Sequence, residues 1–175
     1  MKKPHYIIGI DLGTKCGWAV LSNGTTVSKA GERLESGTWD FSVKRHEGGG
    51  MRYVRFANAL RALLDRWAFD TSAKGTSVHL AFEEVRRHRG VAAAHVYGGL
   101  MATLQCVLED RETKIPYVSI PVGTIKKHAT GKGNASKEEM MTSAKKQWQD
   151  ERWEFQDDNE ADALWVASAY LNGLF

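Results

Sequence analysis

Two apolar strands and one helix of this chain meet acidic residues, and that pattern constrains the fold most strongly. The apolar run of residues 5–11 ends in Asp11, and residues 80–82 run straight into Glu83 and Glu84. A third acidic cluster, residues 157–162, precedes an apolar helical pattern. Carboxylates at the ends of buried strands are costly unless another group compensates their charge. The sequence therefore predicts that the three acidic segments converge on a shared cation site.

Hydrophobic periodicity predicts an α/β fold with five strands. The strands are expected over 5–11, 16–22, 25–41 (interrupted near Gly31), 77–84 and 116–120. The first three are joined by short connections, including the strong hairpin signal Asn23-Gly24, and should be antiparallel. Helical patterns precede the last two strands, which should therefore run parallel to the first. The expected fold class is a mixed five-stranded sheet flanked by helices, with the Asp11 strand in the centre.

The remaining segments have helical patterns, and all 175 residues are expected to form one domain. Ser136 and Asp157 each precede a glutamate at capping-box spacing, which marks two helix starts. Helices are expected over about 51–67, 92–110 and 123–130, then from Ser136 and from near Asp157.

The bulk composition narrows the possible functions without choosing among them. The formal net charge of +3 and the pI of about 8.8 permit a polyanionic partner but do not demand one. Cys16 and Cys106 form no CxxC pair, which argues against zinc, and both are expected to be reduced and buried. We expect no signal peptide and no membrane span, and therefore a cytoplasmic protein.

The acidic residues are of the type that phosphodiester hydrolysis requires. An attacking water must lose a proton and the leaving oxygen must be stabilised, and two divalent ions about 3.5–4 Å apart do both. Mg²⁺ prefers hard oxygen ligands, and Mn²⁺ is expected to substitute for it. The sequence thus predicts two ions per site, with Asp11 best placed to bridge them.

The residues leave two assignments open. Glu83 and Glu84 point to opposite faces of their strand, so only one can face the site, and periodicity does not choose between them. Near the last helix, Asp158 and Asn159 each share a face with Asp162. Acids in a first helical turn can also serve only as caps or as favourable partners of the helix dipole. Asp162 lies in the second turn and is therefore the better functional candidate.

Three short motifs carry a family resemblance that spans residues 8–169. They are Ile8-Gly-Ile-Asp-Leu-Gly-Thr14, Phe82-Glu-Glu-Val85 and Glu160-Ala-Asp-Ala-Leu164. In order, spacing and strand–strand–helix placement, the set resembles the RuvC-type Holliday junction resolvases of the ribonuclease H-like superfamily. The acidic run before Leu164 looks most like the members carried by bacteriophages.

The resemblance implies a crossover junction endodeoxyribonuclease that uses Mg²⁺ and serves DNA recombination and repair. Its metal-binding positions map to Asp11, Glu83 and Asp162. A further position falls on Asn159, where Asp158 is the favoured ligand and Asn159 the close alternative. The resemblance also implies paired, symmetric nicks that leave a 5′-phosphate and a 3′-hydroxyl.

Basic residues near the acidic motifs are expected to contact branched DNA. They are Arg86, Arg87, Arg89, Lys126, Lys127, Lys132 and Lys137. Arginine is well suited to phosphate, and Lys137 is also a catalytic candidate that would offset charge on the scissile phosphate. The resemblance further implies a homodimer, whose two-fold symmetry would match a four-way junction. The small residues of the helix over 92–102 are the expected interface.

Three other functions compete with this interpretation. The Asp11-Leu-Gly-Thr14 motif also opens the phosphate-binding loop of actin-like and sugar-kinase ATPases, but those proteins need two such domains. A nuclease of the same fold could instead act on flaps, forks or RNA, because loop shape sets substrate preference. A non-catalytic relative would have lost its metal site, and the presence of Asp11, Glu83 and Asp162 argues against that.

Overall fold

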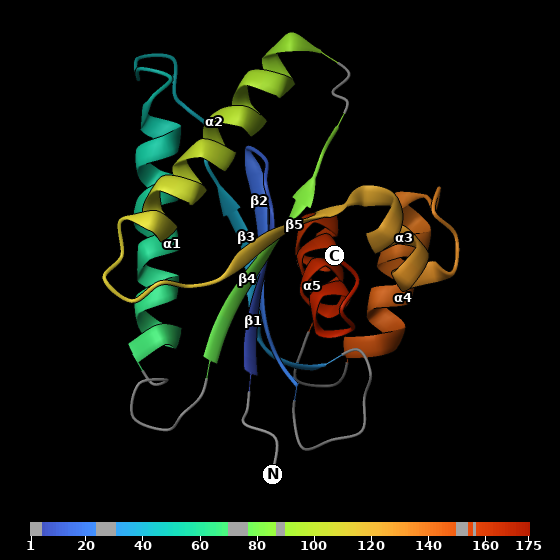
Figure 1. Cartoon of the computed structure of the whole chain (residues 1–175). Helices are drawn as coiled ribbons and strands as arrows, with labels where there is room; N and C mark the ends of the chain where they lie inside the picture. Colours follow the sequence, from blue (N-terminus) through green and yellow to red (C-terminus); the bar gives the residue numbers. More distant parts are fainter. Residues whose placement is uncertain (1–4, 24–30, 70–76, 87–89, 150–153, 156) are drawn as a thin grey trace.

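The computed structural model describes residues 5–23, 31–69, 77–86, 90–149, 154–155 and 157–175. A mixed sheet lies in the middle, with helices α1 and α2 on one face and α5, flanked by α3 and α4, on the other (Figure 1). In chain order the elements are β1 (His5–Asp11), β2 (Lys15–Ser22), β3 (Glu32–Asp40), α1 (Met51–Phe69), β4 (Ser77–Glu84), α2 (Val91–Glu109), β5 (Tyr117–Pro121), α3 (Val122–Thr130), α4 (Lys137–Trp148) and α5 (Asp158–Leu171).

The five strands have the order β3-β2-β1-β4-β5, which confirms the predicted fold class. Strand β1 is central, antiparallel to β2 and parallel to β4, and β5 continues the parallel half of the sheet. Ile10 of β1 lies opposite Phe82 of β4. Asp11 and Glu83 are the next residues of these two strands, so both lie at the same edge of the sheet.

Most predicted element bounds agree with the structure within one or two residues. Strand β3 begins at Glu32, and the earlier part of its predicted range, together with Gly24 of the hairpin signal, lies outside the described residues. Ser136 forms the predicted capping box with Glu139. Asp157 caps α5 by accepting a hydrogen bond from the Glu160 N–H, 3.1 Å away.

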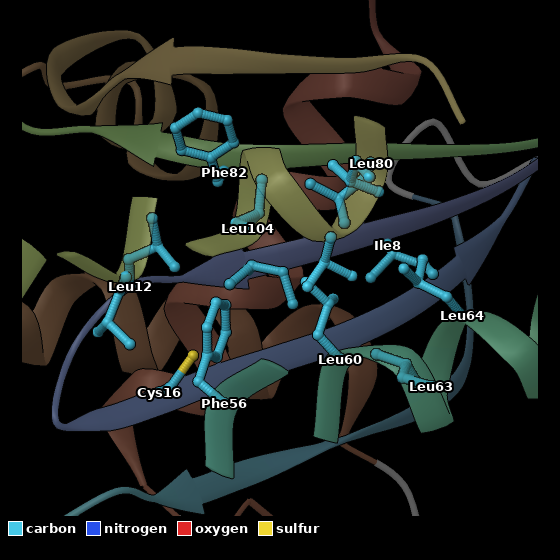
Figure 2. Close-up of a cluster of buried hydrophobic side chains, with 14 of the residues drawn as sticks. Ile8, Leu12, Cys16, Phe56, Leu60, Leu63, Leu64, Leu80, Phe82 and Leu104 are labelled. Atoms are coloured by element: carbon cyan, nitrogen blue, oxygen red, sulfur yellow. The ribbon is translucent and has the colours of Figure 1, made fainter. Parts of the chain in front are cut away.

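Two hydrophobic cores lie on opposite faces of the sheet and determine which way each strand residue points. Ile8 and Leu80 belong to the core under α1 and α2, which Figure 2 shows together with Phe56, Leu60 and Leu104. Ile7 and Ala81 belong to the other core, under α5. Because side chains alternate along a strand, Asp11 and Glu83 share the α5 face, and Glu84 points to the other face.

Helix α5 lies directly on β1 and β2 because both strands carry glycine where the helix crosses. A Cβ atom at Gly9 would overlap the Ala163 carbonyl oxygen, and one at Gly17 would overlap the Asn159 carbonyl oxygen. Close contact of backbones at these two points brings the first turns of α5 to the sheet edge that carries Asp11.

Replacing Gly17 with Ala is expected to destabilise the protein by about 1–3 kcal/mol, because α5 must move away from β2 to make room. Urea denaturation measures the change in the free energy of unfolding. Gly48→Ala is the matched control, since a Cβ there meets nothing within 4 Å. Equal stability of the two variants would contradict the close contact between α5 and β2.

Side chains of β3 fix the first turn of α5 from the side. Thr38 Oγ1 donates to Asp157 Oδ1 at 2.6 Å. Arg33 and Ser36 donate to the Glu160 carboxylate at 2.5 and 2.8 Å. The Arg33–Glu160 pair is almost fully buried, with side-chain exposures of 4% and 1%. The Glu160 carboxylate therefore ties α5 to β3, a role that the capping-box spacing did not predict.

Helix α2 has two features that the sequence analysis did not anticipate. By length and composition alone, the 19 residues of α2 are apolar enough to span a membrane, although no such stretch was expected. Small residues raise its apolar content, while a stripe that includes Leu100, Leu104 and Leu108 packs in the core. Cys106 lies on the exposed side of α2, whereas Cys16 is buried as predicted, and both are free thiols.

Candidate active site

Acidic side chains from three elements meet where β1 and β4 end. Asp11 closes β1, Glu83 is the penultimate residue of β4, and Asp162 lies in the second turn of α5. A pocket of about 180 Å³ is lined by Glu83, Asp162, Lys126, Lys137, Val122, Ile125 and Met140. Glu84 is not among these residues and instead pairs with Arg86 at 3.1 Å. The geometry therefore favours Glu83 over Glu84 as the site residue of β4.

Burial and mutual repulsion make the three carboxyl groups hard to ionise. Burial raises the pKa of Asp11 well above its usual value, and the charges of Glu83 and Asp162 raise it further. Burial, followed by the charge of Asp162, raises the pKa of Glu83 to about 7. Burial and the charge of Asp158 raise the pKa of Asp162 to about 6. The cluster thus concentrates negative charge that a bound cation would stabilise.

The donor set fits a hard divalent ion such as Mg²⁺ or Mn²⁺, because all its ligand atoms are carboxylate oxygens. Within the described part of the chain, no three acidic, histidine or cysteine side chains already surround a common metal position. The carboxylates of Asp11, Glu83 and Asp162 nevertheless lie close enough to raise one another's pKa, so they are the groups that would hold an ion.

Asp158 is better placed than Asn159 to complete the acidic set. Asp158 pairs with Lys137 and contributes to the raised pKa of both Asp11 and Asp162. The side chain of Asn159 hydrogen-bonds Asp157, where it helps to lower the pKa of that carboxyl group. This bond holds the Asn159 amide at the helix cap, so the arrangement favours Asp158 as the fourth oxygen ligand.

Nearly the whole chain is similar in structure to solved Holliday junction resolvases. The structure of T. thermophilus RuvC in complex with Holliday junction substrate matches with a TM-score of 0.73 and 19% sequence identity. The match covers 97% of this chain and 93% of the RuvC chain. A second structure of Thermus thermophilus RuvC matches with a TM-score of 0.73 and 20% sequence identity, over 97% of both chains. This chain has the RuvC-type, ribonuclease H-like fold.

A more distant structure shows the same fold, whereas comparisons of the sequence alone find no match. The yeast mitochondrial Holliday junction resolvase Ydc2 matches with a TM-score of 0.57 and 13% identity, over 94% of this chain and 78% of Ydc2. No family model and no curated protein matches this sequence. The RuvC-type architecture is thus visible in three dimensions at a sequence identity of only 13–20%.

In this RuvC-type fold, two of the four predicted DNA-binding lysines lie at the acidic pocket. Lys126 and Lys137 line it, and their charges partly offset the raised pKa of Glu83 and Asp162. Lys126 also donates a hydrogen bond to the Ala135 carbonyl oxygen at 2.8 Å. Lys132 instead pairs with Glu139 at 2.7 Å and lines a separate pocket between α3 and α4. Lys127 is exposed and does not line the acidic pocket.

The predicted arginine cluster is only partly visible in the structure. Arg86 is exposed and pairs with Glu84 just beyond the end of β4. Arg87 and Arg89 lie outside the described residues. Arg86 therefore lies next to the sheet edge that carries the acids, with its charge partly matched by Glu84.

Sequence reasoning missed the residues that hold the acids in place. Ser36, Thr38 and Arg33 fix the first turn of α5. Tyr97 of α2 contacts the backbone at the end of β4 through its hydroxyl group. Polar side chains two residues apart on β3 were a readable signal for Ser36 and Thr38. Nothing in the sequence marked Tyr97, which looked like a core residue of α2.

The metal-free protein is expected to lose stability as the pH rises from about 5 to about 8, relative to an Asp11→Asn variant. Because the folded-state pKa values of Asp11, Glu83 and Asp162 are raised, the folded protein keeps protons that the unfolded chain has released. This penalty is absent below the unfolded pKa of about 4, grows as the pH rises, and for Glu83 is complete only above its folded-state pKa of about 7.

Thermal melting in EDTA at several pH values measures this effect. The melting temperature of Asp11→Asn minus that of the wild type should increase with pH. Mg²⁺ should stabilise the wild type more at about pH 8 than at about pH 5, because it binds the deprotonated carboxylates. A difference between the proteins that stays constant with pH would show that Asp11 does not carry this penalty.

Proposed function

We propose that this chain is a metal-dependent endonuclease that resolves four-way DNA junctions. One observation carries the proposal: Asp11, Glu83 and Asp162 come from β1, β4 and α5 to one edge of the sheet, with strongly raised pKa values. The fold that places them is shared over 97% of the chain with a RuvC whose structure includes a Holliday junction.

The chain's own residues have distinct roles in the proposed reaction. Asp11, Glu83 and Asp162 would hold two Mg²⁺ ions, with Asp158 as the fourth ligand and Asn159 as the alternative. When bound, the ions supply an activated water and stabilise charge on the leaving oxygen. Because Asp11 ends the central strand and the charges of Glu83 and Asp162 both act on it, it is the residue that would serve both ions.

Two lysines complete the charge balance of the pocket. Lys126 and Lys137 lie beside Glu83 and Asp162, where a phosphate entering the pocket would meet both ammonium groups. Positive charge fixed in advance at this point stabilises the extra negative charge that develops during attack. The Lys137–Asp158 pair, whose lysine is largely exposed, is free to exchange its partner for phosphate. The expected products are a 5′-phosphate and a 3′-hydroxyl.

A homodimer would give the two sites that paired nicks require. Two-fold symmetric proteins match the two-fold symmetry of a four-way junction. The outward side of α2 supports this part of the proposal, because Val91 is 72% exposed and Ala92, Ala93 and, about three turns further along the helix, Ala102 are exposed as well. An apolar helix face with small side chains allows a second helix to approach closely.

The proposed activity is tested with labelled synthetic substrates in Mg²⁺, Mn²⁺ or EDTA. A four-way junction is compared with a linear duplex, a flap and an RNA–DNA hybrid. We expect paired symmetric nicks in the junction and no cleavage in EDTA. Equal cleavage of flaps or hybrids would indicate a broader structure-selective nuclease. Absence of metal-dependent cleavage of every substrate would refute nuclease function.

A further inference from the structure

The end of β4 extends beyond its neighbour in the sheet. The β1–β4 ladder ends at the pair Ile10–Phe82, and β1 itself ends at Asp11. In a parallel ladder, every second residue of one strand bonds the C=O and the N–H that flank its counterpart on the next strand, and the Leu80 N–H of β4 points the other way, to the Pro116 carbonyl oxygen. The Glu83 C=O and the Val85 N–H flank Glu84. They therefore face the position that β1 would occupy if it continued.

Tyr97 of α2 fills that position with its hydroxyl group. The phenol O–H donates to the Glu83 carbonyl oxygen at 2.8 Å and accepts a hydrogen bond from the Val85 N–H at 3.3 Å. A tyrosine hydroxyl can donate and accept at once, as a strand residue does through its N–H and C=O. Tyr97 thus replaces one residue of the missing strand. Its side chain is well packed, since the residue is only 8% exposed.

The position of Tyr97 is itself fixed from behind by the packing of α2 on α1. Gly99, two residues further along α2, lies against the ring of Tyr53 so closely that a Cβ there would overlap it. Tyr97, Leu12 and Val85 also line a groove of about 380 Å³ beside the acidic edge. The Tyr97 hydroxyl therefore connects a rigid helix pair to the backbone of a site residue.

We propose that Tyr97 is a positioning residue for the metal site, which holds the Glu83 backbone so that the Glu83 carboxylate faces Asp11 and Asp162. The inference rests on the proposed role of Glu83 as a metal ligand. Without the hydroxyl, the Glu83 C=O and the Val85 N–H lose their hydrogen-bond partner on the β1 side. The Glu83 backbone, and with it the carboxylate, is then free to move. Residues that orient metal ligands typically contribute about 10- to 100-fold to metal affinity.

The test measures Mn²⁺ binding to the full chain without DNA, by titration calorimetry or by the loss of the free-Mn²⁺ resonance signal. Tyr97→Phe should weaken Mn²⁺ binding by about 10-fold or more. The matched control is Tyr53→Phe, which removes another hydroxyl from the same helix pair. The Tyr53 hydroxyl donates to the His95 carbonyl oxygen of α2 at 3.4 Å and not to the backbone of β4. That control should bind Mn²⁺ like the wild type.

Each outcome of the titration decides a different claim. If the wild type binds Mn²⁺ and Tyr97→Phe binds it equally well, Tyr97 is only a packing residue and the inference fails while the proposed function stands. If the wild type itself does not bind Mn²⁺, the proposed metal site fails, and the inference fails with it. A lower melting temperature of Tyr97→Phe with unchanged Mn²⁺ affinity also refutes the positioning role.

Hydrogen exchange in the wild type gives a second test that needs no variant. Because coupling between two sites is reciprocal, Mg²⁺ binding should strengthen the Tyr97 bond to the Val85 N–H. Addition of Mg²⁺ should therefore slow exchange of the Val85 amide. The effect should be larger than at the Leu80 amide, which lies in β4 and bonds the Pro116 carbonyl oxygen. Equal effects on the two amides would refute the coupling.

Discussion

Replacement of Asp11 by Asn is expected to slow junction cleavage by at least about 1,000-fold, which corresponds to about 4 kcal/mol in the activation barrier. Asparagine keeps the shape of the side chain but removes the charge that holds both ions. Asp11 closes the central strand between Glu83 and Asp162, whose charges act on it, so no other acid of the site can take its place. Single-turnover cleavage measures the rate, and an electrophoretic shift in EDTA should show unchanged or tighter junction binding.

Glu84→Gln is the matched control for this variant. Glu84 is the acid adjacent to Glu83 but points to the opposite face and pairs with Arg86 at the surface. Exposed ion pairs contribute about 0–1 kcal/mol, so cleavage should change by no more than about fivefold. Cleavage by Asp11→Asn at the wild-type rate would show that the acidic edge is not the active site. A large loss of activity in Glu84→Gln would show that Glu84, and not Glu83, is the site residue of β4.

Replacement of Glu160 by Ala is expected to destabilise the protein by about 3–5 kcal/mol. The change removes the Glu160 carboxylate from beside the Arg33 guanidinium, whose side chain is only 4% exposed. Removing one member of a buried ion pair is costly because the remaining charge stays desolvated. Denaturation in urea measures the loss through the shift in midpoint.

A double variant separates the ion pair from simple loss of packing. Replacing Arg33 by Met and Glu160 by Leu together removes both charges and keeps side-chain volume, so much of the stability should return. The coupling energy follows from the cycle of single and double variants. A loss below about 1 kcal/mol in Glu160→Ala would show that the pair does not hold α5 on β3.

Much of the fold could be predicted from the sequence because the strands are clearly delimited and their order along the chain indicates their directions. The apolar runs before Asp11 and Glu83 are bounded by clear turn signals, and a parallel arrangement of β1 and β4 places their ends together. The alternation of side chains along β4 could not show whether Glu83 or Glu84 faces the site, because both faces of the strand are buried under helices. The choice depends on which face α5 covers, and that is a tertiary property.

Other features were invisible because they depend on irregularity or on contacts between distant elements. The register of β2 and β3 shifts between Val20 and Leu21, and this irregularity lets Arg33 reach the same acid as Ser36. An alternation rule would place these two residues on opposite faces. Tyr97 acts through a hydroxyl group that bonds the backbone of β4, and no local pattern marks such a contact.

The most direct test of the acidic edge as a metal site is diffraction from crystals grown with Mn²⁺, recorded at the manganese absorption edge. Two anomalous peaks about 3.5–4 Å apart are expected, with Asp11 contacting both. Glu83 and Asp162 should contact one peak each, and the fourth ligand would be Asp158 rather than Asn159. Saturating Mn²⁺ that gives no peak between β1, β4 and α5, or a peak at Glu84 instead, would contradict the account.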